Sequence, residues 1–132
     1  SNNNYLGQFT VASGNVDTSA VEAITLAEIG YEFSVVAETN PIDGLIQGGP
    51  LTGQQRRINK VIVDMRNTLA ISVNNQNLVI RNVTDDMSES RTPVTGKKEF
   101  RFLGYSNDPT VTISQSYPLA LDINGLVAEV SF

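Results

Sequence analysis

The sequence predicts an all-β fold, an antiparallel β-sandwich or barrel-like domain of about eight to ten short strands. Its apolar segments are short, rich in Val, Ile, Thr and Phe, and separated by Gly, Pro, Asn or Asp, which is typical of strands and turns. No internal repeat is visible. The 132 residues fit one domain, so we expect residues 1–132 to form a single β-domain. Because the chain opens on Ser1 and not on Met, it is either processed or cut from a longer protein, and we expect a fragment or domain of a larger protein.

The first half of the chain predicts three strands. Tyr5–Val11 is the first. Residues 21–26 allow two interpretations: Ser19 and Glu22 have the spacing of a helix capping box, whereas alternating apolar residues favour a strand, which we adopt. Tyr31–Val36 is the third strand, with its aromatic residues on one face.

Residues 40–55 hold several Gly and Pro residues and are predicted to be the longest loop. The strand pattern that follows, Arg57–Met65, is the strongest in the chain. Apolar side chains alternate along one face, and Ile62 on the opposite face indicates that both faces are at least partly covered. The apolar face consists of Val61, Val63 and Met65.

A hairpin is predicted next. Leu69–Val73 alternates as a strand, Asn74-Asn75 suits a tight turn because Asn tolerates positive φ, and Leu78–Val83 would pair back. Residues 84–96 are polar and are predicted to be a loop.

Three further segments alternate between apolar and polar residues. Glu99–Leu103 is a predicted strand with Phe100 and Phe102 facing inward. Thr110–Gln115 is the next strand. After an apolar face on Leu119, Leu121 and Ile123 and an interruption at Gly125, the last strand places Leu126, Ala128, Val130 and Phe132 on one face.

The chain contains neither Cys nor His. A thiolate nucleophile, a disulfide, an imidazole base and Ser-His or Cys-His catalysis are therefore excluded. We expect a protein that is not an enzyme and that needs no cofactor and no metal. No apolar run reaches the roughly 20 residues of a membrane span, so we expect no membrane partner.

Charge is distributed unevenly. All six acidic residues of positions 1–55 lie in a segment without Lys or Arg, whereas positions 56–132 hold nine basic and eight acidic residues. One interpretation is an ordinary solvated surface. The other is an acidic face and a mixed face on one domain, which would suit head-to-tail contact between identical subunits.

The basic residues form two runs that make a candidate subunit interface. Three interpretations stay open: Lys and Arg that keep a sheet edge from aggregating, contact with an acidic patch on a neighbouring subunit, and contact with nucleic-acid phosphates. The acidic isoelectric point argues against the last. The six residues are Arg56, Arg57, Lys60, Lys97, Lys98 and Arg101.

Other motifs carry less information. Asp85, Asp86 and Glu89 offer oxygen ligands for Ca²⁺, but they lack the EF-hand spacing and suit a solvated polar loop. No phosphate-binding glycine motif occurs. The alternation of charged and aromatic residues over Gly96–Phe102 is more typical of a half-buried strand than of a nucleic-acid stacking platform.

The order of several segments resembles the C-terminal part of the tail tube nozzle proteins of short-tailed bacteriophages, also called tail tubular or tail stabilisation proteins. The resemblance spans roughly residues 20–132, and none of its motifs is catalytic. It departs from the family at Ala120, where a second Pro is expected, and at the polar Asp122–Asn124. The matching segments are Thr25–Phe33, Arg56–Val61 continuing through Asn67-Thr68, Gly96–Phe102, Thr110–Ile113, Pro118–Leu121 and Gly125–Val130.

The resemblance implies a structural virion protein, a viral tail protein that forms a ring with copies of itself at the lower end of the tail and contacts other tail proteins. DNA would pass through the ring during genome ejection without specific binding. The protein would be made in the cytoplasm of the bacterial host and reside in the virion. An acidic channel wall would repel phosphates, and Glu28, Glu32 and Glu38 are the candidates for that face.

A binding module is the alternative function. Such a module would recognise a carbohydrate or a host receptor as part of a protein like a tail fibre, again without catalysis.

Overall fold

A computed structural model describes residues 5–19, 21, 24, 26–43, 45–46, 49–50, 53–80, 84 and 91–131. These residues form eleven strands in four antiparallel sheets, and no helix among them is long and apolar enough to cross a membrane. The strands are β1 Val11–Ala12, β2 Asn15–Val16, β3 Val35–Glu38, β4 Leu45–Ile46, β5 Gly49–Pro50, β6 Arg57–Thr68, β7 Ser72–Val73, β8 Gln76–Asn77, β9 Val94–Arg101, β10 Thr112–Gln115 and β11 Ile123–Ser131.

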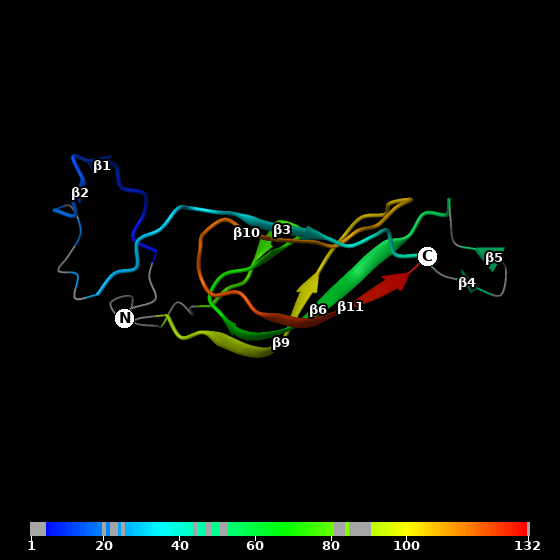
Figure 1. Cartoon of the computed structure of the whole chain (residues 1–132). Coiled ribbons are helices and arrows are strands. Elements are labelled where there is room, and N and C mark those ends of the chain that lie inside the picture. The colour runs from blue at the N-terminus through cyan, green and yellow to red at the C-terminus, as the bar shows by residue number, and fades with distance from the viewer. Residues whose placement is uncertain are drawn as a thin grey trace.

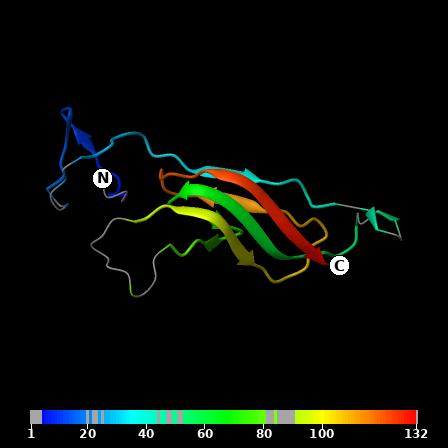
Figure 2. The same ribbon diagram turned by 90° about the horizontal axis from the view of Figure 1, so that it is seen from below.

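Two of the sheets face each other and enclose the core, which confirms the predicted all-β, sandwich-like fold (Figures 1 and 2). The four-stranded sheet has the order β3-β10-β7-β8, and the three-stranded sheet has the order β11-β6-β9. Alternate residues of each strand point to the space between the sheets, because side chains alternate along a strand. The buried core cluster is Ile58, Val61, Val63, Met65, Ile71, Val73, Phe100, Val111 and Ile113.

The central strand β6 confirms the strongest sequence pattern. Val61, Val63 and Met65 are fully buried, and Ile62 on the other face is partly covered. The strand runs three residues beyond the predicted end, to Thr68, because β11 and β9 pair with it on both sides. These neighbouring strands supply hydrogen-bond partners for the backbone N–H and C=O groups of the polar residues at its end.

The hairpin at Asn74-Asn75 is also confirmed. Both residues have positive φ, 45° and 66°, and β7 pairs with β8 across them. The returning strand begins at Gln76, two residues earlier than predicted. A two-residue turn places the residues that flank it, Val73 and Gln76, opposite each other, so pairing starts directly after the turn. Residues 81–83 of the predicted returning strand lie outside the described residues.

Strand β9 corrects the boundary of the predicted loop over residues 84–96. The strand begins at Val94, where β6 offers backbone partners, with Val94 opposite Thr68. It ends at Arg101, and Phe102 N then donates to the carbonyl of Asn59 at 3.0 Å. Phe100 is buried and Phe102 packs partly buried against the core, so their predicted inward direction is confirmed.

The C-terminal elements follow the sequence closely. Val111 and Ile113 are buried, although β10 itself begins at Thr112. In β11 the register with β6 shifts between Ile123 and Gly125, so the predicted interruption is a β-bulge. Phe132 lies outside the described residues.

The N-terminal predictions were largely wrong. In the segment Tyr5–Val11 only Val11 is in a strand, the two-residue β1, and in Tyr31–Val36 the strand begins at Val35. Alternation indicates a strand only where a neighbour supplies backbone partners and a covering surface, and the described residues supply neither to residues 26–34. Of residues 21–26, the described positions 21, 24 and 26 have no regular structure, and the others lie outside the described residues.

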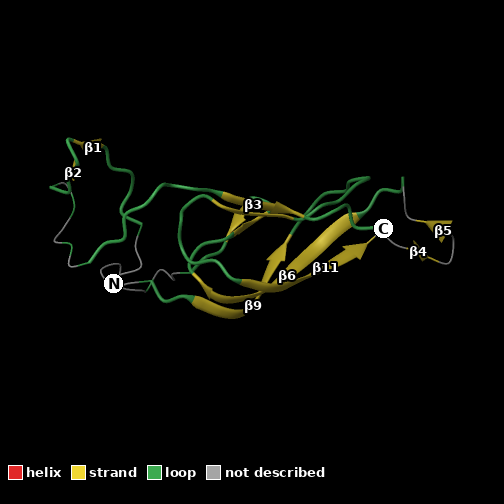
Figure 3. Ribbon diagram, viewed as in Figure 1, coloured by secondary structure: helices red, strands yellow, loops and turns green. Residues whose placement is uncertain are grey.

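Two excursions leave the sandwich at opposite ends (Figure 1). The described residues of positions 5–34 extend beyond one end, and apart from β1 and β2 they have no regular structure; the hairpin of β4 and β5 projects from the other end (Figure 3). This hairpin lies within the predicted loop over residues 40–55 and is a correction to it. The accessible surface is 9635 Å², whereas a compact monomer of this mass exposes roughly 6,800 Å².

Candidate functional site

Pairing of β6 with β9 brings the two basic runs together. Lys60 lies directly opposite Arg101, and Lys97 lies opposite Asp64. Side chains opposite each other in a sheet share a face, so Lys60, Lys97 and Arg101 lie on the outer face of the three-stranded sheet. The sequence contained both runs, but only the strand register could join them.

Arg56 differs from the other five predicted interface residues, because its side chain is only 1% exposed. Its guanidinium donates to the carbonyl oxygens of Ile42 at 2.5 Å and Asn107 at 2.6 Å, and it pairs with Asp43 at 3.1 Å. Arg56 therefore joins two loops of its own domain. No sequence pattern indicates this role, since the partners of Arg56 are two backbone carbonyls and a carboxylate on loops distant in sequence.

The outer face of the three-stranded sheet carries a ladder of charges. Lys60 Nζ lies 3.0 Å from Glu129 Oε2, and Arg101 Nε donates to Glu99 Oε1 at 2.6 Å. The hydrogen bond and charge of Lys60 lower the pKa of Glu129, and Glu129 in turn raises the pKa of Lys60. Two like charges, Lys60 and Arg101, nevertheless face each other in this ladder.

The remaining basic residues reach beyond the ladder. The guanidinium carbon of Arg57 lies 5.4 Å from the ring centroid of Tyr105, within cation–π range. Lys97 and Lys98 are exposed, and within the described part of the chain neither has a carboxylate at ion-pair distance.

The three predicted acidic residues lie on two different elements. Glu28 and Glu32 lie on residues 26–34, which we call the arm, whereas Glu38 lies at the end of β3. Glu32 accepts a hydrogen bond from Tyr5 Oη at 3.0 Å, and Glu38 accepts one from Thr110 Oγ1 at 2.8 Å.

The arm exposes large apolar side chains. Ile29 is 79% exposed, Tyr31 99% and Phe33 57%, and these residues alternate with Glu28, Gly30, Glu32 and Ser34. Buried apolar surface is worth roughly 25 cal/mol per Å², so this exposure is costly unless a partner covers it. This same alternation predicts the strand Tyr31–Val36, which the structure shows only from Val35 onward.

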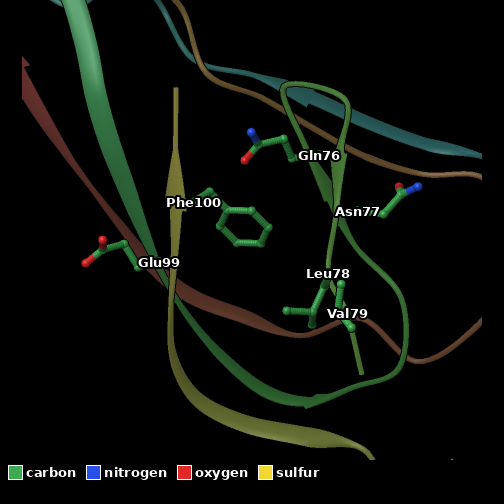
Figure 4. A pocket seen from close by; sticks show the side chains of 6 residues that line it. All are labelled: Gln76, Asn77, Leu78, Val79, Glu99 and Phe100. Atoms are coloured by element: carbon green, nitrogen blue, oxygen red, sulfur yellow. The ribbon is translucent and has the colours of Figure 1, made fainter. Parts of the chain in front are cut away.

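An open groove lies between the edges of the two sheets, where β8 and β9 approach each other (Figure 4). We call it the edge groove; its volume is about 460 Å³. The ring of Phe100 points into it, whereas Glu99 points to the other side of β9 (Figure 4). Gln76 Nε2 bridges the two lips by donating to Arg101 O at 2.9 Å. Its lining is Gln76, Asn77, Leu78, Val79, Glu99 and Phe100.

A second depression, of about 320 Å³, lies where the N-terminal segment meets the sandwich. The rings of Tyr5 and Tyr117 lie 4.9 Å apart there, and Arg91 also lines it. No sequence pattern marks Tyr5, Arg91 and Tyr117 as a site, because they are far apart along the chain.

The candidate Ca²⁺ ligands Asp85, Asp86 and Glu89 lie outside the described residues. Within the described ranges, no three Asp, Glu, His or Cys side chains gather where they would hold a metal ion.

Comparison with known proteins leaves the chain without an assigned family. No protein-family model matches it. No curated protein matches it either.

Proposed function

We propose that this chain is a non-catalytic structural protein of a virion, an assembly domain of a bacteriophage tail nozzle that associates with copies of itself and with other tail proteins. The exposed arm is the observation that carries the proposal. A free-standing domain seldom leaves three large apolar side chains of one segment in water. In an assembly, a neighbouring subunit would bury these side chains, so their exposure in the isolated subunit is what association predicts.

The separation of charges supports association between identical subunits. The acidic arm and the basic strand β9 are different elements of one domain, so they complement each other between copies in a head-to-tail contact. A head-to-tail contact whose rotation closes gives a ring, which is the form that the resemblance to nozzle proteins implies.

For the passage of DNA through the ring, we propose that Glu38 lies on the channel wall. This exposed carboxylate lies on β3, which pairs with β10, so its place relative to the sandwich is set by the sheet. A carboxylate on a channel wall repels phosphates and keeps DNA from adhering. We expect Glu38→Gln to slow genome ejection and Glu38→Lys to slow it further, with particle yield unchanged. Equal ejection rates in all three phages would argue against a channel position.

Removing the gene from its phage tests the function as a whole. We expect DNA-filled heads that lack the lower end of the tail and are not infectious, and we expect the protein supplied in trans to restore infectivity. Gradient-purified particles examined by electron microscopy and mass spectrometry provide the readout. Complete, infectious tails without the protein would exclude the proposal.

Glycan binding is the second candidate, and the depression between Tyr5 and Tyr117 favours it. Aromatic rings beside Arg91 offer a sugar an apolar surface and a hydrogen-bond donor. Screening the chain on a glycan array, with Tyr117→Ala as the comparison, tests this candidate. A signal that Tyr117→Ala abolishes would support it, and an empty array would exclude it for the glycans presented.

A further inference from the structure

Strand β9 has one edge with no strand partner among the described residues, and the Arg101 carbonyl on that edge accepts a side-chain hydrogen bond from Gln76 Nε2. It is the last strand of its sheet, with β6 as its only strand neighbour among the described residues. The carbonyl of Arg101 faces away from β6, since it accepts Gln76 Nε2. Because backbone groups alternate along a strand, those of Lys97 and Glu99 also face the open edge. Unpaired edges of this kind are common docking sites for extended segments.

The two faces of β9 differ in character. Gly96, Lys98 and Phe100 lie opposite the buried Met65, Val63 and Val61, so they share the inner face that borders the edge groove. Gly96 has φ 116°, and a Cβ placed there would meet nothing within 4 Å, so open space lies beside it. Lys97, Glu99 and Arg101 share the outer face.

The arm carries the complementary pattern at the same spacing. Its acidic residues, Glu28 and Glu32, are four positions apart, as are Lys97 and Arg101. In an antiparallel register Glu28 lies opposite Arg101, Gly30 opposite Glu99, and Glu32 opposite Lys97. Because position 30 is glycine, no acidic side chain of the arm lies opposite Glu99.

The same register suits the apolar residues. Ile29 then lies opposite Phe100 in the edge groove, Tyr31 opposite Lys98, and Phe33 opposite Gly96, where space is open. Cross-strand pairs of aromatic and aliphatic residues stabilise a sheet, and an aromatic ring over a strand glycine is a known favourable pairing. Glu28 would also flank Arg101, which now faces the like-charged Lys60.

The arm cannot reach the β9 edge of its own chain without leaving β3. The arm leads directly into β3, at one edge of the four-stranded sheet, whereas the groove lies beside β8 at the opposite edge. Two further strands, β10 and β7, lie between those edges. An arm that fills this groove therefore belongs to a second copy.

We propose that the arm of one copy adds as an antiparallel strand to the open edge of β9 in the next copy, with Ile29, Tyr31 and Phe33 directed to the edge groove. The inference rests on the self-association part of the proposed function. The contact uses two different surfaces of each subunit, so it propagates head to tail. It assigns Glu28 and Glu32 to the subunit interface and leaves only Glu38 for a channel wall.

Cysteine cross-linking of the full chain tests the register without background, because the chain has no Cys. We expect the double variant Glu32→Cys/Lys97→Cys to form covalent dimers and longer chains under mild oxidation. Glu32→Cys/Arg101→Cys is the matched control, since these positions meet only in the parallel register. Equal cross-linking of the two pairs, or cross-links within single chains, would overturn the proposed contact.

Charge exchange tests the complementarity. Glu28→Lys/Glu32→Lys makes both surfaces basic, and Lys97→Glu/Arg101→Glu makes both acidic, so each variant alone should associate roughly tenfold more weakly than the wild type. A mixture of the two restores opposite charges at every contact and should co-assemble. Sedimentation velocity measures both effects, and unfolding in urea confirms that each variant is folded. A mixture that stays dissociated would overturn the charge pairing.

The outcomes separate this contact from the proposed function. A wild-type chain that associates while the cysteine pairs and charge exchanges have no effect overturns the arm contact and leaves self-association intact. A wild-type chain that stays monomeric at its solubility limit and gives no cross-links overturns both.

Discussion

The guanidinium of Arg56 donates to the carbonyl oxygen of Asn107 at 2.6 Å across 51 positions of sequence. The same side chain holds the carbonyl of Ile42, so one buried cation joins two loops to the start of β6. A planar guanidinium can reach both carbonyls at once because its donors diverge in a fixed plane.

Removing this clamp should be costly. We expect Arg56→Ala to lower the free energy of unfolding by about 3 kcal/mol, because charged hydrogen bonds in a buried site are lost and the carbonyls lose their donor. Arg56→Lys should retain only part of the free energy of unfolding that Arg56→Ala loses, since an ammonium reaches fewer of these acceptors. Urea denaturation measures both, and an Arg56→Ala variant as stable as the wild type would contradict the clamp.

At the Asn74-Asn75 turn, two substitutions of Asn75 should change the free energy of unfolding in opposite directions. Asn75 has φ 66°, a conformation that Gly adopts freely and Ala does not. We expect Asn75→Gly to raise the free energy of unfolding by about 0.5 kcal/mol and Asn75→Ala to lower it by about 1 kcal/mol. Asn74 is a poorer site for this test, because its side chain also accepts Thr112 N at 2.7 Å. Equal effects of Gly and Ala at position 75 would argue against the turn geometry.

The Lys60–Glu129 pair predicts a pH dependence. The bond from Lys60 holds the pKa of Glu129 below its ordinary 4.5, so the stability that this carboxylate contributes is present above that pH and is lost as pH falls through the lowered pKa. Glu129 holds the pKa of Lys60 above 10.5, so the contribution of Lys60 is lost only as pH rises through that raised value. Wild type should therefore exceed Glu129→Gln in stability between these limits and lose that advantage in acid.

A double-mutant cycle isolates this pair. In a Lys60→Met background, Glu129→Gln should change the unfolding midpoint little, and its pH dependence should disappear. Urea is the suitable denaturant, because guanidinium chloride would screen the charges. An unchanged pH profile in the Lys60→Met background would assign the effect to another group.

Alanine substitutions at a buried and an exposed position on neighbouring strands should differ in their effect on stability. Met65 is fully buried between the sheets, and we expect Met65→Ala to lower the free energy of unfolding by about 2–5 kcal/mol. Val127, which lies on β11 opposite Ile62, is 65% exposed, and Val127→Ala should change it by no more than about 0.5 kcal/mol. A large loss at Val127 would show that the outer face of this sheet is covered in solution.

The sequence by itself determined the all-β class, the central strand at Arg57–Met65, the Asn74-Asn75 turn and the inward faces of Phe100 and Val111. Each of these depends on local preference, on alternation or on φ, which neighbouring residues in sequence control. The bulge at Gly125 belongs to the same group, because glycine marks a local break in strand pattern.

Only the tertiary structure decided where strands begin and end and which charges meet. Strand β9 begins at Val94, inside the segment predicted to be a polar loop, because β6 pairs with it there, whereas Tyr31 and Phe33 alternate like a strand and stay unpaired among the described residues. Arg56 and Lys60 lie four positions apart, yet one is buried in a clamp and the other lies in a surface ladder. Backbone pairing and burial depend on segments distant in sequence, and a local pattern carries no record of them.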